Sequence, residues 1–191
     1  KVIVVSVPGN HGRQDNHKDY NNALRNLDYL VAEVAAMQCS DIKNVEHIIP
    51  DAYSINLDIK GFTFNISHGD DVPGNAGTPW YGIERRNNRI QAIHAAQGKQ
   101  VHYKVMGHFH KSSMTQDHSG EFLVNGSWKA TDEFLYNRVG GYTEPVQLIH
   151  GVHSQRGITW RVPINLRTKD DVYGPQRYKL NMACEAMQNK V

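Results

Sequence analysis

Short apolar runs alternate along the chain with longer stretches in which apolar residues recur every three to four positions. The short runs predict strands over residues 2–7, 53–58, 62–67 and 101–106, and hairpins over 112–125 and over 145–152 with 157–164. The helical spacing predicts helices over roughly 17–38 and 82–97 and a short helix near 130–138. Residues 39–50 are expected to be a connection. Strands interspersed with helices in this order predict a mixed α/β fold.

Each of the two longer helices has a predicted apolar side. The first side is formed by Leu24, Leu27, Leu30, Val31 and Val34. In the second helix, Ile83, Ile90 and Ile93 are expected to face inward and Arg85, Arg86 and Arg89 outward. The outward set is either a solvated helix face or, with Trp80 and Tyr81 nearby, a surface for phosphates and bases.

Composition limits the class of protein. The 191 residues suffice for one domain, which we expect over 1–166, followed by a polar tail over 167–191. No 18-residue apolar run occurs, so no membrane span is expected. Cys39 and Cys184 fall in no metal or redox pattern, which favours a reducing compartment and a cytoplasmic location. Residues 1–71 hold 6 basic and 10 acidic side chains and residues 72–191 hold 15 and 9, so an anionic partner would suit the second part.

Three predicted strands end in glycine-containing loops that carry possible metal ligands. The loops are Gly9-Asn10-His11-Gly12-Arg13, His68-Gly69-Asp70 and Gly107-His108-Phe109-His110. Glycine allows tight turns, and imidazole and amide oxygens bind zinc, manganese or iron. In an extended segment His108 and His110 would point to one side. A single histidine at a strand end is usually a hydrogen-bonded surface group, but three such loops in one fold favour a metal site.

These motifs, in this order, resemble those of the calcineurin-like metallophosphoesterase superfamily over residues 2–128. The resemblance implies a mixed-sheet β-sandwich flanked by helices and a site for two divalent metal ions, with manganese favoured over zinc or iron. It implies that Asn10, His68 and His108 bind one ion and His110 the other, and that His11 is catalytic. A metal-bridging hydroxide would attack phosphorus while His11 assists the leaving oxygen.

The chain departs from the family pattern in two places. The family's Asp-x-His and Gly-Asp-x-x-Asp motifs would precede Asn10, where the sequence has no room for them. We therefore expect the fold to be incomplete at its N-terminus and the fragment alone to bind metal poorly and turn over little. Gly12 stands where the family commonly has an acidic residue, and Arg13 beside it is a candidate for binding a substrate phosphate.

The leading hypothesis is a metal-dependent phosphoesterase that hydrolyses a phosphodiester or phosphomonoester, with nucleic acid or a nucleotide as candidate substrates. The alternative is a catalytically incomplete phosphoesterase-like scaffold that binds nucleic acid or protein. A structural zinc protein built on His68, His108 and His110 is a third hypothesis, in which Asn10 would be an unusual fourth ligand.

Overall fold

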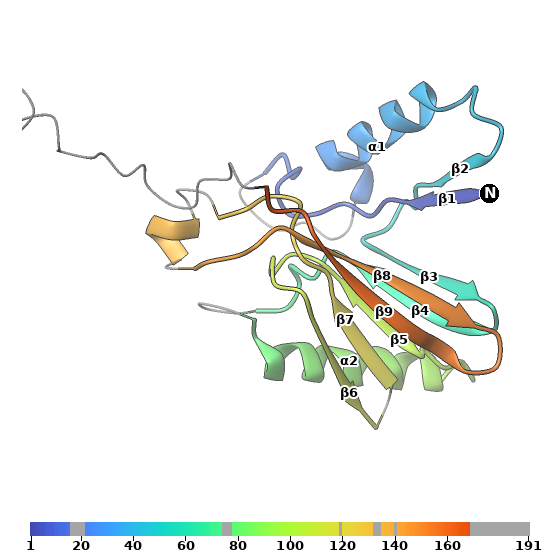
Figure 1. Ribbon diagram of the computed structural model, residues 1–191. Helices are drawn as coiled ribbons and strands as arrows, with labels where there is room; N and C mark the ends of the chain where they lie inside the picture. The colour runs from blue at the N-terminus through green and yellow to red at the C-terminus, as the bar shows by residue number, and fades with distance from the viewer. Residues whose placement is uncertain (16–21, 74–77, 119, 132–134, 140, 169–191) are drawn as a thin grey trace, which may run out of the picture.

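A computed structural model describes residues 1–15, 22–73, 78–118, 120–131, 135–139 and 141–168 (Figure 1). The strands are β1 (Val2–Val5), β2 (Val45–Ile48), β3 (Ser54–Ile59), β4 (Phe62–Ser67), β5 (Tyr103–Met106), β6 (Ser113–Asp117), β7 (Gly120–Val124), β8 (Val146–His153) and β9 (Gly157–Asn165). The helices are η1 (Ala23–Arg25), α1 (Leu27–Gln38), α2 (Trp80–Ala95) and the short π-helix η2 (Leu135–Val139).

A five-stranded mixed sheet forms the centre of the fold, in the order β3-β4-β5-β7-β6. The strands β4, β5 and β7 run parallel, and β3 and β6 pair antiparallel at the two edges. The predicted mixed α/β class and the predicted strands of this sheet are confirmed. Because β4 and β5 are parallel neighbours, the loops that follow them leave the same edge of the sheet.

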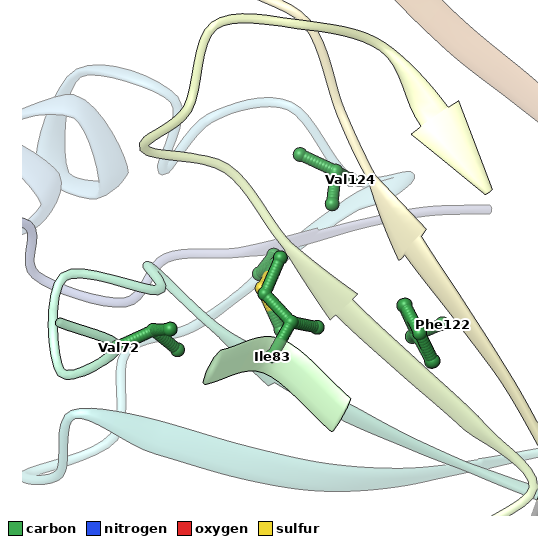
Figure 2. Close-up of a cluster of buried hydrophobic side chains, with 5 residues drawn as sticks. Val72, Ile83, Phe122 and Val124 are labelled. Atoms are coloured by element: carbon green, nitrogen blue, oxygen red, sulfur yellow. The ribbon is translucent and has the colours of Figure 1, made fainter. Parts of the chain in front are cut away.

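Different elements cover the two faces of this sheet. On one face, Ile83 of α2 lies fully buried among Val72, Met106, Phe122 and Val124, as Figure 2 shows. On the other face lies the β8–β9 hairpin, drawn in orange across β4 and β5 in Figure 1. There the backbone N–H of Ile158 donates to Oη of Tyr103 over 2.9 Å. The result is a central sheet between a helix layer and a second β layer.

A separate parallel pair, β1 and β2, lies beside α1 (Figure 1). Val2 of β1 pairs with Val45 of β2, and the chain passes from one strand to the other through α1. The prediction that residues 39–50 form only a connection is therefore wrong. The strand β2 has four residues, and Glu46 and His47 interrupt its apolar character. Its pairing with β1, rather than its own pattern, makes it a strand.

The first predicted helix is shorter than expected, and its apolar side is exposed. Residues 16–21 lie outside the described part of the chain, η1 covers Ala23–Arg25, and α1 begins at Leu27. The apolar positions Leu24, Leu27, Leu30, Val31 and Val34 are between 44% and 67% exposed. Among the described residues, α1 buries none of its own side chains.

The second predicted helix is confirmed as α2, but two of its residues lie differently from the prediction. Ile93, expected to face inward, is 59% exposed because it lies near the end of the helix, beyond the core around Ile83. Arg86, expected to face outward, forms an ion pair with Asp71 and donates to Oγ of Ser67 on β4. The positions 83, 86, 87 and 90 share the sheet-facing side of a helix, so Arg86 is held against the sheet.

The remaining predictions fall partly outside the described residues. The predicted hairpins correspond to β6–β7 and β8–β9, although Ser119 of the first turn is not described. Of the short helix predicted near 130–138, Leu135–Val139 is helical, residues 130–131 are not, and residues 132–134 lie outside the described part of the chain. Most of the predicted tail lies beyond residue 168. In the described part of the chain, no helix combines the length and apolar character needed to cross a membrane.

Candidate functional site

Three loops meet at the edge of the central sheet where β4 and β5 end. The parallel pairing places Gly107 next to His68, and the N–H of Gly107 donates to the carbonyl oxygen of His68 over 2.9 Å. The loop after β1 approaches from the side. A Cβ atom on Gly9 would lie 3.1 Å from Cε1 and Nδ1 of the His68 ring. Glycine at position 9 therefore allows this close packing.

Asn10, His68 and His108 bring three possible donor atoms together. Nε2 of His68 lies 2.9 Å from Oδ1 of Asn10 and 3.2 Å from Nδ1 of His108. The two imidazole rings meet edge to face, with centroids 5.0 Å apart. The sequence predicted these three residues as ligands of one ion, and the structure does place them in one cluster, which we call the Asn10–His68–His108 cluster.

The protonation state of His68 suits a metal ligand. Burial lowers the pKa of His68 below its usual 6.5, and electrostatic interaction with His11 and His110 lowers it further. The carboxylates of Asp70 and Asp28 act in the opposite direction and raise it. Because the pKa is lowered overall, the ring is neutral at pH 7 and keeps a nitrogen lone pair for a cation.

The spacing of the cluster fits a single divalent ion. In octahedral coordination, ligand atoms about 2.1 Å from a cation and at right angles to one another lie about 3 Å apart. The contacts of 2.9 and 3.2 Å around Nε2 of His68 are hydrogen bonds in this structure, and their lengths are also compatible with this ligand spacing. Among the described residues, no three His, Cys, Asp or Glu side chains form a metal-binding group. The Asn10–His68–His108 cluster is consistent with that absence, because its third donor is the amide oxygen of Asn10 and asparagine is not one of those four residue types.

His11, Arg13 and His110 are the other residues that the sequence predicted for this site. All three side chains are exposed, and His11 and His110 act on His68 through their charges. The backbone of Arg13 forms an isolated bridge with Asn26. The roles predicted for these residues, catalysis for His11, phosphate binding for Arg13 and binding of a second ion for His110, stay predictions.

The backbone after β5 differs from the expected extended segment. His108 and His110 have φ angles of 63° and 59°, which place both in the left-handed region. The two side chains are therefore not arranged as alternate residues of a strand, and that prediction is wrong. Non-glycine residues in this region cost about 1 kcal/mol or more each, and such strain concentrates at functional sites.

Two residues that the sequence analysis did not single out lie against the Gly9–Arg13 loop. They are Asn26, which precedes α1 and is 2% exposed, and Asp28 in its first turn. A Cβ atom on Gly12 would lie 2.5 Å from the backbone nitrogen of Asp28 and closer still to Oδ1 of Asn26. An acidic side chain could not replace Gly12 without moving α1. The sequence signal was present as an Asn-x-Asp helix start, but only the fold brings it to the loop.

Comparison with known proteins yields weak structural likenesses. No family model and no curated protein sequence matches the chain. Vps29 of Entamoeba histolytica complexed with Zn²⁺ is 12% identical, with a TM-score of 0.44 over 87% of this chain and 98% of that one. Vps29 of Cryptosporidium parvum is 14% identical, with a TM-score of 0.40 over 86% and 96%. The Thermotoga maritima protein TM1076 is 15% identical, with a TM-score of 0.40 over 70% and 73%.

Proposed function

We propose that this chain carries part of the active site of a metal-dependent phosphoesterase. The observation that supports the proposal is that Asn10, His68 and His108 come together from three separate loops at one sheet edge. Nε2 of His68 lies 2.9 Å from Oδ1 of Asn10 and 3.2 Å from Nδ1 of His108. Chemistry at this edge agrees with the general rule that sites in open α/β sheets lie beyond the carboxyl ends of strands.

Asn10, His68 and His108 would hold the cation. A divalent ion bound there would supply a Lewis acid and lower the pKa of a water molecule. The chain's own residues would orient the substrate around that position. The exposed guanidinium of Arg13 would bind a phosphate oxygen, and the exposed imidazole of His11 would donate a proton to the leaving oxygen.

Nucleic acid or a nucleotide is the substrate class that the helix α2 favours. Tyr81, Arg85 and Arg89 follow one another at intervals of four along α2 and line one shallow hollow with Glu84, Asn88 and Ala92. Tyr81 is 77% exposed, so its ring is accessible for stacking. Arg86 does not join this surface because Asp71 and Ser67 hold it against the sheet.

Hydrolysis of bis-p-nitrophenyl phosphate in the presence of Mn²⁺ tests the proposal. We expect His108→Ala to lower the rate by about a hundredfold, because it removes one of three donors from the cluster. His118→Ala, at an exposed turn position, is the matched control and should keep the wild-type rate. Full activity in His108→Ala would contradict the assignment.

A second candidate function is a phosphoesterase-like scaffold that binds nucleic acid or protein without turnover. The neutral character of the cluster favours it, because two imidazoles and one amide offset none of a cation's charge. Binding of Mn²⁺ without hydrolysis by the intact protein, together with unchanged binding of single-stranded DNA after His108→Ala, would support this scaffold over the enzyme.

A further inference from the structure

The Gly9–Arg13 loop is held in place by the first residues of α1. Nδ2 of Asn26 donates to the carbonyl oxygen of Gly9 over 2.7 Å, and the N–H of Gly9 donates to Oδ2 of Asp28 over 2.8 Å. The N–H of Leu27 donates to the carbonyl oxygen of Gly12 over 2.6 Å. Both polar backbone groups of Gly9 are therefore bound by side chains 17 and 19 residues away.

Asn26 uses both ends of its amide group. While Nδ2 binds Gly9, Oδ1 accepts the N–H of Asp28 over 2.9 Å and so caps α1. The side chain is almost completely buried, with 2% of its surface exposed. Asn26 consequently links the start of the helix to the loop, and its orientation is fixed from both sides.

This arrangement bears directly on the Asn10–His68–His108 cluster. Asn10 follows Gly9 in the chain, and Gly9 packs against the ring of His68. A shift of Gly9 would therefore move Oδ1 of Asn10 away from Nε2 of His68, which it now approaches to 2.9 Å. Groups that orient metal ligands typically alter metal affinity by about tenfold to a hundredfold.

We propose that Asn26 and Asp28 are positioning residues of the candidate metal site, a proposal that rests on the proposed function. Their side chains bind the two backbone groups of Gly9 and thereby set where Asn10 meets His68 and His108. Their described hydrogen bonds are to the loop and within the start of α1, and the Asp28 carboxylate also acts on the charge of His68.

Two conservative variants separate this role from helix capping. Asn26→Asp keeps an oxygen that can cap α1 but replaces the donor to Gly9 with a carboxylate facing a carbonyl oxygen. Asp28→Asn keeps an acceptor for the N–H of Gly9, whereas Asp28→Ala removes it. Asn44→Asp and Asp41→Asn, at exposed positions before β2, make the same chemical changes away from the loop and are the matched controls.

Hydrogen exchange at the Gly9 amide tests the positioning directly and without metal. We expect exchange about tenfold faster in Asp28→Ala and in Asn26→Asp, because the bond from Gly9 to Asp28 is lost or displaced. Asp28→Asn and the two controls should stay within about threefold of wild type, and circular dichroism should show α1 intact in Asn26→Asp. Wild-type exchange at Gly9 in Asp28→Ala would overturn the proposal.

Titration with Co²⁺, followed by its visible absorption, tests the consequence for the cluster. We expect Asn26→Asp and Asp28→Ala to weaken Co²⁺ binding by about tenfold, with Asp28→Asn close to wild type. Wild-type affinity in Asn26→Asp would contradict the positioning role. Wild-type protein that binds no Co²⁺ would instead contradict the proposed function, while the exchange measurement would still decide whether Asn26 and Asp28 hold the loop.

Discussion

At the scale of single residues, the loop after β5 combines possible ligands with an unfavourable backbone. His108 and His110 both have positive φ angles, which glycine adopts far more readily than histidine. Gly107, which precedes them, does not have a positive φ angle. The left-handed positions of this loop are therefore occupied by the two histidines and not by the glycine. The backbone after β5 is thus less stable than its sequence could make it, which is a common property of binding loops.

Substitutions at His110 should show this strain. We expect His110→Gly to be more stable than His110→Ala by about 1 kcal/mol, because alanine keeps the left-handed penalty and glycine does not. At an ordinary exposed position the order is the reverse. Urea unfolding of the two variants, with wild-type protein in the presence of a chelator as reference, measures the difference in unfolding free energy. Equal stabilities, or a more stable alanine variant, would show that position 110 is not left-handed in solution.

His68 should make the stability of the chain depend on pH. Its pKa in the folded state is lowered by burial, so the unfolded chain takes up the proton first as the pH falls. Its neutral form therefore supports folding fully above pH 6.5, and that contribution is lost as the pH falls below this value. His150 acts in the same direction, because burial and then the neighbouring Arg161 lower its pKa.

We expect the free energy of unfolding, measured with chelator present, to fall between pH 7 and pH 5. In His68→Gln this fall should be smaller, since only His150 and the other groups remain to respond. Urea titrations at each pH measure the slope. A variant slope equal to that of wild type would contradict the buried, neutral state of His68.

At the scale of elements, α2 has one side in the core and one in solvent. Ile83 and Asn87 are fully buried against the central sheet, and Arg86 lies between these positions with its side chain only 13% exposed. Arg85 and Arg89 lie on the outer side with Tyr81. Three arginines that are similar in the sequence therefore have two different environments.

Reversing the charge of α2 should separate these environments. We expect Arg85→Glu with Arg89→Glu to weaken binding of single-stranded DNA by about tenfold or more at low salt and to leave the thermal midpoint within about 2 °C. Arg86→Ala should lower the thermal midpoint, because it leaves Asp71 without its cation. Fluorescence anisotropy and thermal unfolding measure the two effects. Unchanged DNA binding in the double variant would remove the support that α2 lends to nucleic acid as substrate.

At the scale of the whole molecule, the central sheet is covered and most of β1 is exposed. The sheet has α2 on one face and the β8–β9 hairpin on the other (Figure 1). In contrast, Val2 and Ile3 of β1 are 51% and 52% exposed, although parallel strands are usually buried on both faces. The apolar side of α1 is exposed as well. Within the described residues, the stable core is that of the central sheet.

Polar substitutions on α1 should therefore cost little stability. We expect Leu30→Glu with Val34→Lys, four residues apart on α1, to lower light scattering at high protein concentration and to leave the thermal midpoint within about 2 °C. For comparison, the single core substitution Ile83→Ala should lower the free energy of unfolding by about 2 kcal/mol or more. A large loss of stability in the α1 variant would mean that this side is covered in solution.

Apart from β2, the sequence by itself determined the strands and hairpins, together with α2 and the three loops that hold Asn10, His68 and His108. Alternating apolar residues and turn glycines are local signals, so short stretches of sequence are enough to locate these elements. The grouping of Asn10, His68 and His108 as ligands came from the resemblance of the three motifs to a known family. In the fold, the parallel pairing of β4 and β5 brings His68 and His108 together, whereas Asn10 comes from the loop after β1, a strand of a separate sheet.

Only the tertiary structure decided the features that depend on residues distant in the chain. β2 becomes a strand through its pairing with β1, and Arg86 is held against the sheet by Asp71 and Ser67. Among the described residues, α1 buries none of its own side chains. The hydrogen bonds from Asn26 and Asp28 to the backbone of Gly9 join residues 17 and 19 positions apart in the sequence. Periodicity reports which side of an element is apolar, whereas packing and long-range hydrogen bonds decide what, if anything, that side contacts.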